Sequence, residues 1–259
     1  MNDSQPTQFV EFRARRDAAM CAPFSPAALI ATQWLSEDAA ALQHVAGTWY
    51  AADGQVVALG IEPDDVTELT AGAAWVDDSL VFAPEASVIW RGNQLLAIER
   101  YGSYGLRIFD PTSPGRTSMR GIDAYKYDPA WAVEAQFQLI DPEAVEIDLV
   151  NGLRVPGTVT AVFTFDHAGT PVTMQIDAPP GEPTAIAFLD KMALEAGAPL
   201  RFLPIRWPEG GTGKTIVDFN YAMLPPCAFS PHFMCPLPLA ANRLPFAVTA
   251  GERAPIRQG

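Results

Sequence analysis

Residues 79–99, SLVFAPEASVIWRGNQLLAIE, contain three short apolar runs separated by turn residues. The runs cover residues 79–82, 87–90 and 94–99, and Gly92-Asn93 stands between the last two. Runs of this length that are rich in Val, Ile, Leu and aromatic residues are typical of β-strands, and a Gly-Asn pair favours a tight hairpin turn. The stretch therefore predicts consecutive antiparallel strands.

The same rhythm extends in both directions along the chain. Further strands are expected at residues 55–59, 105–109, 132–139, 145–150, 157–166, 171–177, 199–207 and 215–220. Strands that recur at intervals of roughly 8 to 12 residues, with few helical stretches between them, indicate an antiparallel sheet. The predicted fold is mainly β, an antiparallel β-barrel or a barrel-like sandwich.

The N-terminal part of the chain has a different pattern. Apolar side chains between residues 25 and 41, among them Trp34, recur at spacings close to those of one helical face. We expect one or two N-terminal helices within residues 8–45, followed by the β-barrel over residues 46–259. No low-complexity linker interrupts the chain, so a single domain is expected.

Composition excludes several classes of function. The chain has 30 acidic and 17 basic residues, a net charge of −13, so we expect no nucleic-acid partner. No run approaches the ~18 apolar residues of a membrane span, and the first residues lack the features of a secretory signal peptide. A cytoplasmic protein with a small-molecule substrate and no membrane partner is expected, and a homodimer is left open.

The C-terminal part of the chain is irregular and rich in proline. Its motifs are Val217-Asp218-Phe219-Asn220, Pro225-Pro226-Cys227-Ala228-Phe229, Cys235-Pro236-Leu237-Pro238, Asn242-Arg243-Leu244-Pro245 and Ala250-Gly251-Glu252. Because proline lacks an amide donor and clashes with the preceding helical turn, this segment cannot be an ordinary helix. We expect a rigid, shaped loop, with Cys227 and Cys235 in a structural role.

In these motifs the chain resembles the bacterial domain-of-unknown-function family 1684. The N-terminal Phe12-Arg13-Ala14-Arg15-Arg16-Asp17 also looks like that family's Trp-Arg-x-x-Arg-Asp element, and the resemblance covers nearly the whole chain. The chain looks like a diverged member. It has Met223-Leu224-Pro225 where members usually carry Tyr-Asn-Pro, so a branched alkyl side chain replaces a polar amide.

Motifs for common cofactors and nucleophiles are absent from the sequence. Residues 208–215, PEGGTGKT, lack the first glycine of a phosphate-binding loop and run into a predicted strand, so they indicate a turn. Neither a Gly-x-Ser-x-Gly elbow nor a Gly-x-Gly-x-x-Gly fingerprint occurs. We therefore expect no cofactor.

A metal site is a weaker possibility. His232 lies between Cys227 and Cys235, and Asp218 would be needed as a fourth ligand. This spacing fits no standard zinc pattern, so buried structural cysteines are favoured and no metal is expected. The corresponding alternative function is a metal-dependent hydrolase.

The polar residues of the C-terminal motifs are the candidate site. Asp218 and Glu252 are the candidate catalytic residues, since a carboxylate in an apolar cavity can act as a general acid or base. The alternative is that Asp218, Asn220, Asn242 and Glu252 brace irregular backbone by hydrogen bonds. The candidate substrate-binding residues are Asn220, Tyr221, Asn242, Arg107, Arg120, Trp131, Arg201 and Leu224.

Together these observations favour an enzyme that acts without a cofactor on a bulky, mostly apolar small molecule in a barrel cavity. A cyclase or isomerase of natural-product biosynthesis, of the polyketide type, is expected, because such an enzyme needs few catalytic groups. A shaped pocket and one acid or hydrogen-bond donor suffice for such reactions. The alternative is a non-catalytic barrel protein that binds the same kind of molecule.

Overall fold

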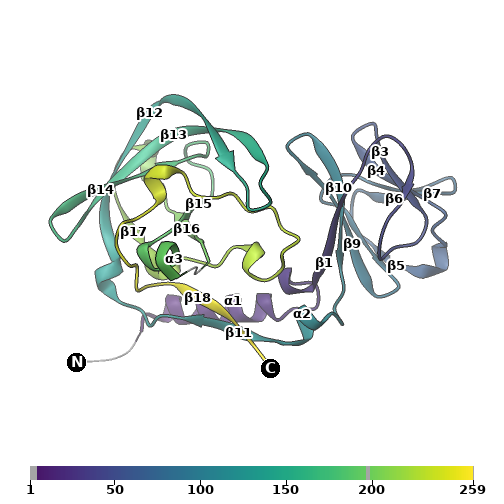
Figure 1. Ribbon diagram of the computed structural model, residues 1–259, viewed down its shortest axis with the longest axis horizontal. Helices are drawn as coiled ribbons and strands as arrows, with labels where there is room; N and C mark the ends of the chain where they lie inside the picture. The colour runs from purple at the N-terminus through teal and green to yellow at the C-terminus, as the bar shows by residue number, and fades with distance from the viewer. Residues whose placement is uncertain (1–4, 197–198, 259) are drawn as a thin grey trace. The chain divides into compact units, whose positions relative to one another are not determined.

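The computed structural model describes residues 5–196 and 199–258 of the 259-residue chain. The fold is mainly β with antiparallel sheets, as the strand rhythm predicts (Figure 1). The helices are α1 (Thr7–Met20), α2 (Pro114–Thr117) and α3 (Lys191–Ala196). The strands are β1 (Leu29–Trp34), β2 (Ala40–Ala41), β3 (Thr48–Ala52), β4 (Gln55–Leu59), β5 (Val66–Leu69), β6 (Ala73–Val76), β7 (Ser79–Phe82), β8 (Ser87–Trp90), β9 (Asn93–Arg100), β10 (Ser103–Phe109), β11 (Met119–Ala124), β12 (Ala132–Asp148), β13 (Arg154–His167), β14 (Thr170–Ile176), β15 (Thr184–Phe188), β16 (Arg201–Ile205), β17 (Gly213–Asp218) and β18 (Glu252–Arg257).

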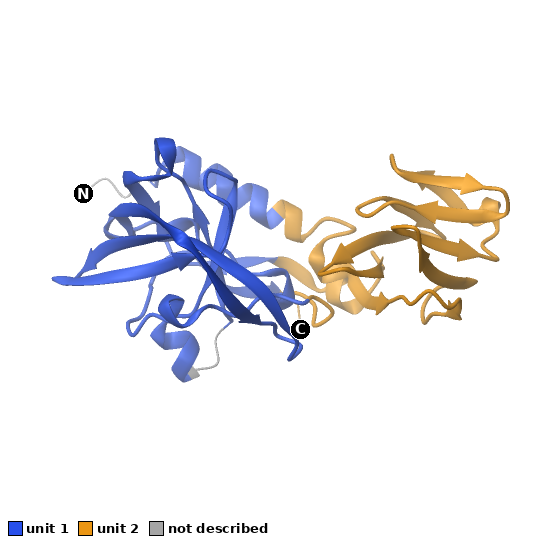
Figure 2. Ribbon diagram, turned by 90° about the horizontal axis from the view of Figure 1, so that it is seen from above, with its two compact units in different colours: residues 1–17, 121–228, 234–256 blue, residues 18–120, 229–233, 257–259 orange. Residues whose placement is uncertain are grey.

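The chain divides into two compact units, which Figure 2 shows in blue and orange. Unit 1 comprises residues 1–17, 121–228 and 234–256, and unit 2 comprises residues 18–120, 229–233 and 257–259. Each unit is built from separate stretches of the chain, because α1 and the C-terminal segment both contribute to unit 1.

Unit 2 contains two five-stranded antiparallel sheets. Their strand orders are β1-β10-β9-β8-β5 and β2-β3-β4-β7-β6. Side chains of both sheets share one core, in which Trp49 of β3 and Leu95 of β9 are fully buried. Asp53 and Gly54, at the β3–β4 turn, both have positive φ, the conformation that a type I′ hairpin turn requires.

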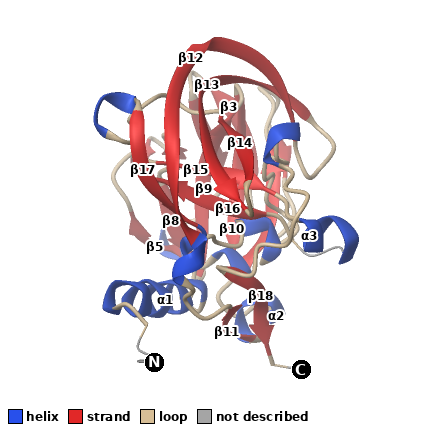
Figure 3. Ribbon diagram, turned by 90° about the vertical axis from the view of Figure 1, so that its left-hand side faces the viewer, coloured by secondary structure: helices blue, strands red, loops and turns tan. Residues whose placement is uncertain are grey.

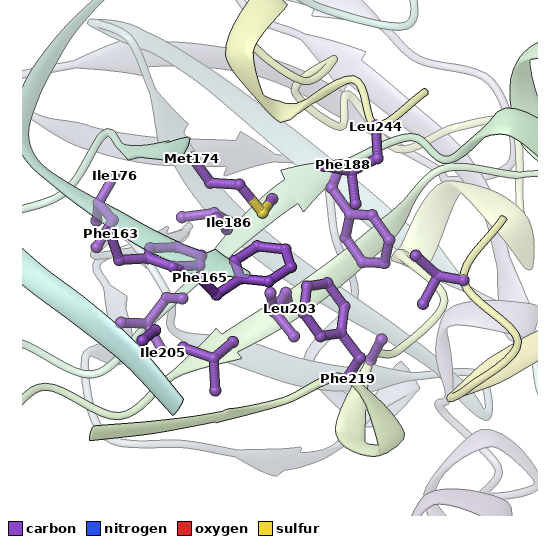
Figure 4. Packing of buried hydrophobic residues seen from close by; sticks show 14 of the residues in the cluster. Phe163, Phe165, Met174, Ile176, Ile186, Phe188, Leu203, Ile205, Phe219 and Leu244 are labelled. Atoms are coloured by element: carbon purple, nitrogen blue, oxygen red, sulfur yellow. The ribbon is translucent and has the colours of Figure 1, made fainter. Parts of the chain in front are cut away.

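Unit 1 is organised around a four-stranded antiparallel sheet in the order β14-β13-β12-β17, with the pair β15-β16. The long strands β12 and β13 run side by side (Figure 3). Aromatic side chains fill the interior: Phe163, Phe188 and Phe219 have no exposed surface and pack against Leu203 (Figure 4). None of the described sheets closes into a barrel, and the barrel-like sandwich is the predicted architecture that fits.

The prediction of one N-terminal helix is confirmed by α1, but the helix expected over residues 25–41 is wrong. A single 3₁₀ turn (Pro26–Ala28) leads there into strand β1. Alternate residues of β1 point to the core, beginning with the buried Leu29 and Ala31, and the strand pairs with β10. Over so short a run, the spacing of apolar residues fits both a helix and a strand. The segment forms a strand because β10 offers an edge with which it can pair.

The described helices include none that is both long and apolar enough to cross a membrane.

Candidate functional site

Unit 1 has an open groove of about 530 Å³ beside the end of β17. The N-terminal part of α1, the ends of β16 and β17 and the segment before β12 form its walls. Its lining residues are Pro6, Gln8, Phe12, Tyr127, Pro204, Ile205, Arg206, Ile216, Asp218, Tyr221 and Met223. A groove with this mixture of apolar walls and a few polar groups is the usual form of a small-molecule site.

Aromatic packing under α1 forms one wall of this groove. Phe9 is buried and meets the rings of Tyr127 and Tyr221 edge-on, with centroids 5.3 and 5.7 Å away. Phe12 lies one helical turn further along α1 and packs on Tyr221 at 4.9 Å. Residues i and i+3 of a helix share a face, so one face of α1 holds both tyrosines in place.

Asp218 lies at the C-terminal end of β17, with one carboxylate oxygen committed to the backbone. Its Oδ1 accepts the backbone N–H of Asn220 at 2.9 Å and the amide of the same residue at 2.8 Å. Its Oδ2 accepts the hydroxyl of Tyr127 at 3.2 Å on the groove wall. The carboxylate is therefore a cap for the following 3₁₀ turn on one side and a polar group of the groove on the other.

Both tyrosines of the groove keep their protons well above neutral pH. Burial, and then the Asp218 carboxylate, raise the pKa of Tyr127 above its ordinary value. The pKa of Tyr221 is raised by the same two causes in the same order, and the cation of Arg206 opposes the rise. The groove thus offers two neutral phenols between a carboxylate and a guanidinium.

Glu252, the second candidate catalytic residue, lies in a different environment. It has no exposed surface, and its Oε1 accepts Arg13 at 2.7 Å and Arg16 at 2.8 Å. Its Oε2 accepts the backbone N–H of Leu224 at 2.7 Å and a second Arg16 nitrogen at 2.9 Å. Asp17 accepts the N–H of Ile122 nearby. We call Arg13, Arg16 and Glu252 the buried ion cluster.

A smaller hollow of about 180 Å³ adjoins this cluster. Asp190 and Arg201 lie in its wall and form a buried ion pair at 3.0 Å. Arg201 also donates to the carbonyls of Val248 and Ala250, and burial lowers its pKa. With its donors used by the protein in this way, Arg201 supports the fold of unit 1 rather than a ligand.

Two other predicted binding residues of unit 1, Asn220 and Asn242, brace the backbone. The amide of Asn220 exchanges hydrogen bonds with the backbone of Asp128, and that of Asn242 does the same with Gln175. Trp131 is buried and donates to Thr249 at 3.1 Å. These contacts match the bracing alternative that the sequence left open.

The remaining predicted binding residues do not line the groove either. The side chain of Leu224 is buried and its backbone holds Glu252. Arg107 and Arg120 belong to unit 2, where Arg107 lies over the ring of Phe233 and Arg120 donates to backbone carbonyls. Of the predicted site residues, the structure brings Asp218 and Tyr221 together in the groove.

Cys227 and Cys235 lie in contact within unit 1, and their structural role stays a prediction. The backbone N–H of Cys227 donates to the Sγ of Cys235 at 3.4 Å, and the hydrogen bond between the two side chains raises the pKa of Cys227. The exposed His232 belongs to unit 2. Within the part of the chain that the structure describes, no three His, Cys, Asp or Glu side chains form a group that could hold a metal ion.

Sequence reasoning missed Tyr127 and Phe12 as groove residues, and it weighed Arg206 only as one of several possible donors to an anionic oxygen. A signal for Phe12 was present, because it repeats Phe9 at helical spacing next to the motif arginines. Tyr127 and Arg206 follow strands at positions with no motif around them. They join Asp218 only through the packing of three separate stretches of chain.

Comparison with known proteins gives one family. The model of the family described as "Protein of unknown function (DUF1684)" matches residues 117–253, just over half of the chain. The chain is also similar to a solution NMR structure of an uncharacterized protein from Haloarcula marismortui, with 30% sequence identity and a TM-score of 0.41. That match covers 52% of this chain and 76% of the other. No curated protein matches the chain.

Proposed function

The chain belongs to the DUF1684 family of proteins of unknown function, and we propose that it binds a mostly apolar small molecule in the groove beside Asp218. One observation carries this proposal. The groove combines the apolar side chains of Phe12, Ile216 and Met223 with a polar corner at Asp218 and Tyr127. Apolar walls supply affinity by removing hydrocarbon from water, and a few fixed polar groups supply orientation.

The exposure of the groove wall supports a ligand of this kind. Ile216 is 50% exposed although it sits on a paired strand of the main sheet, and Phe12 and Tyr221 are half-buried beside it. A volume of about 530 Å³ is within the range of small-molecule sites. The interior of the sandwich is filled, so the ligand is placed in this open groove and not in a central barrel cavity.

A second candidate function is catalysis of a cofactor-free isomerisation or cyclisation at the same groove. The observation that favours it is the Tyr127 hydroxyl 3.2 Å from Asp218 Oδ2. A carboxylate can remove a proton from a carbon acid, and a neutral phenol can donate to the oxygen that becomes negative. The raised pKa of Tyr127 keeps this donor protonated at neutral pH.

Such a step neither gains nor loses a proton overall. Asp218 takes a proton from the carbon next to a substrate carbonyl, and Tyr127 turns its single hydroxyl proton from Asp218 to the carbonyl oxygen. The proton then returns from Asp218 to a different carbon, which moves the double bond and restores both side chains. A bulky ketone or polyketide-like chain is the proposed substrate class, and a cytoplasmic site is proposed for the protein.

Binding is tested with the neutral, apolar fluorophore N-phenyl-1-naphthylamine. We expect saturable binding to the wild type and at least a tenfold weaker affinity for Ile216→Asp, because the new carboxylate would be desolvated against the ligand. Leu153→Asp is the matched control, since Leu153 is 55% exposed and lies outside the groove. Equal losses in both variants, or no saturable binding by the wild type, would overturn the proposed site.

Catalysis is tested with a bulky β,γ-unsaturated ketone, whose conversion to the conjugated isomer is followed by ultraviolet absorbance. Turnover that disappears in Asp218→Asn while fluorophore binding persists would support the enzyme. Tyr127→Phe should lower the rate about 10²-fold or more, as loss of one oxyanion donor does elsewhere. Fluorophore binding without conversion of any such ketone leaves the binding function as the conclusion.

A further inference from the structure

We infer that the natural ligand of the groove carries a carboxylate, which pairs with Arg206 while the apolar body lies along Phe12 and Ile216. This inference rests on the proposed function and names the chemical class of its ligand. It comes from the different states of the two charged side chains in the groove wall. Asp218 accepts hydrogen bonds from the protein, whereas the side chain of Arg206 has no hydrogen-bond or ion-pair partner among the described residues.

Arg206 is exposed at the end of β16 and makes no hydrogen bond or ion pair with any residue that the structure describes. Arg243 is likewise exposed in unit 1 with no described side-chain partner, but it does not line the groove. Other arginines of unit 1 have carboxylate partners, for example Arg154 with Asp148 at 2.8 Å and Arg253 with Asp123 at 3.2 Å. An arginine fork that the many carboxylates of the chain leave open is suited to an anionic ligand.

Asp218 is the opposite case. Its two oxygens already accept hydrogen bonds from Asn220 and Tyr127, so a ligand cation would compete with groups that are fixed in place. The groove is therefore better suited to an anion at Arg206 than to a cation at Asp218. Tyr221 lies close enough to Arg206 for the guanidinium to act on its pKa.

The distribution of apolar residues fixes the rest of the ligand. The apolar side chains of Phe12, Ile205, Ile216 and Met223 also line the groove and offer no ionic partner. A phosphate or sulfate alone would leave these side chains uncovered. A fatty acid or an aryl- or polyketide-derived carboxylic acid would cover them and pair with Arg206, as a free hydrocarbon would not.

The test compares dodecanoate with dodecan-1-ol, two probes with the same alkyl chain, as competitors of N-phenyl-1-naphthylamine. We expect the acid to bind about five- to tenfold more tightly than the alcohol, since the pair with an exposed arginine is screened by solvent. This preference should shrink as salt is raised. In Arg206→Gln the acid and the alcohol should bind within twofold of each other.

Two further variants are compared with Arg206→Gln: Arg206→Lys, which keeps the charge, and Arg243→Gln, which is the matched control. Lysine keeps the charge without the planar fork, so part of the preference should remain. Arg243 is exposed in the same unit but does not line the groove, and its substitution changes the net charge equally. Its variant should keep the full preference.

The outcomes separate this inference from the proposed function. Equal binding of acid and alcohol by the wild type, with fluorophore displacement by both, would overturn the carboxylate while leaving the groove as a site. An acid preference that survives Arg206→Gln would overturn the role of Arg206. Absence of displacement by both probes, together with absence of fluorophore binding, would overturn the groove itself.

Discussion

The groove at Asp218 and the buried ion cluster at Glu252 are both built from the C-terminal motifs, yet their carboxylates are held in opposite ways. Glu252 has no exposed surface and four hydrogen bonds, three of them from arginine side chains. Asp218 is half-buried, has no cation within salt-bridge distance among the described residues, and shares one oxygen with a tyrosine of the groove. One carboxylate is a structural anchor, and the other borders an open hollow.

This difference separates a structural role from a functional one among the C-terminal motifs. A buried carboxylate with two arginines has exchanged its water for fixed partners. Removing Glu252 leaves Arg16 without a counter-ion and Arg13 with only the more exposed Asp17, at 3.6 Å. A half-exposed carboxylate keeps access to solvent and ligand. The catalytic role that the sequence assigns to Glu252 therefore has little geometric support, whereas the role assigned to Asp218 keeps its place in the groove.

The largest loss of stability is expected from a substitution at Glu252. Glu252→Gln should lower the free energy of unfolding by about 3 kcal/mol or more, because Arg13 and Arg16 lose their buried counter-ion. Urea unfolding followed by tryptophan fluorescence measures this loss. The groove should keep its affinity for the fluorophore wherever the variant remains folded.

Glu134→Gln is the matched control for this prediction. Glu134 pairs with Lys214 at 2.6 Å in the same unit, but both side chains are more than 60% exposed. Such a pair contributes about 0 to 1 kcal/mol. If Glu252→Gln were no more destabilising than Glu134→Gln, the buried ion cluster would not be the anchor described here.

The residues that form these two regions also show what the sequence could reveal. Hairpins such as β13–β14 are local: the strands expected at residues 157–166 and 171–177 are found, and the turn between them has positive φ at Ala168 and Gly169. The strand expected at residues 215–220 is found as β17, which ends two residues earlier, at Asp218. Both follow from patterns within about ten neighbouring residues.

The contacts that assign roles depend instead on distant parts of the chain. Arg13 and Glu252 are 239 residues apart, and no periodicity links them. Two arginines at i and i+3 on α1 indicate a common face, but not which of the 30 acidic residues will meet it. The same limit applies to Tyr127 and Asp218, which come from elements 91 residues apart.

A smaller effect is expected at Asp218. Asp218→Ala removes the side-chain cap of the 3₁₀ turn Phe219–Tyr221 and should lower the free energy of unfolding by about 1 kcal/mol. Tyr127→Phe removes the hydroxyl alone and should cost less in stability. Comparable losses at Asp218 and Glu252 in the same urea titration would contradict the distinction between the two regions.

The smallest change in the free energy of unfolding is expected at a third carboxylate of unit 1. It tests whether a carboxylate of this unit is destabilising when it is buried without a cationic partner. Asp177 follows β14, is half-buried, and has no Lys or Arg within salt-bridge distance among the described residues. Burial raises its pKa above the ordinary value. The folded protein therefore binds this proton more tightly than the unfolded chain, and its stability falls as the pH rises from the unfolded pKa of about 4 through the folded one.

Asp177→Asn removes that ionisation and should stabilise unit 1 at neutral pH by about 0.5 kcal/mol. The gain should shrink as the pH falls toward about 4, because Asp177 is then also neutral. Unfolding of both proteins by urea between these pH values measures it, and Asp141→Asn at an exposed position subtracts the general effect of lowering the net negative charge. A gain that is independent of pH, or equal to that of Asp141→Asn, would mean that burial without a cation does not penalise a carboxylate here. The arginines around Glu252 would then no longer account for its complete burial.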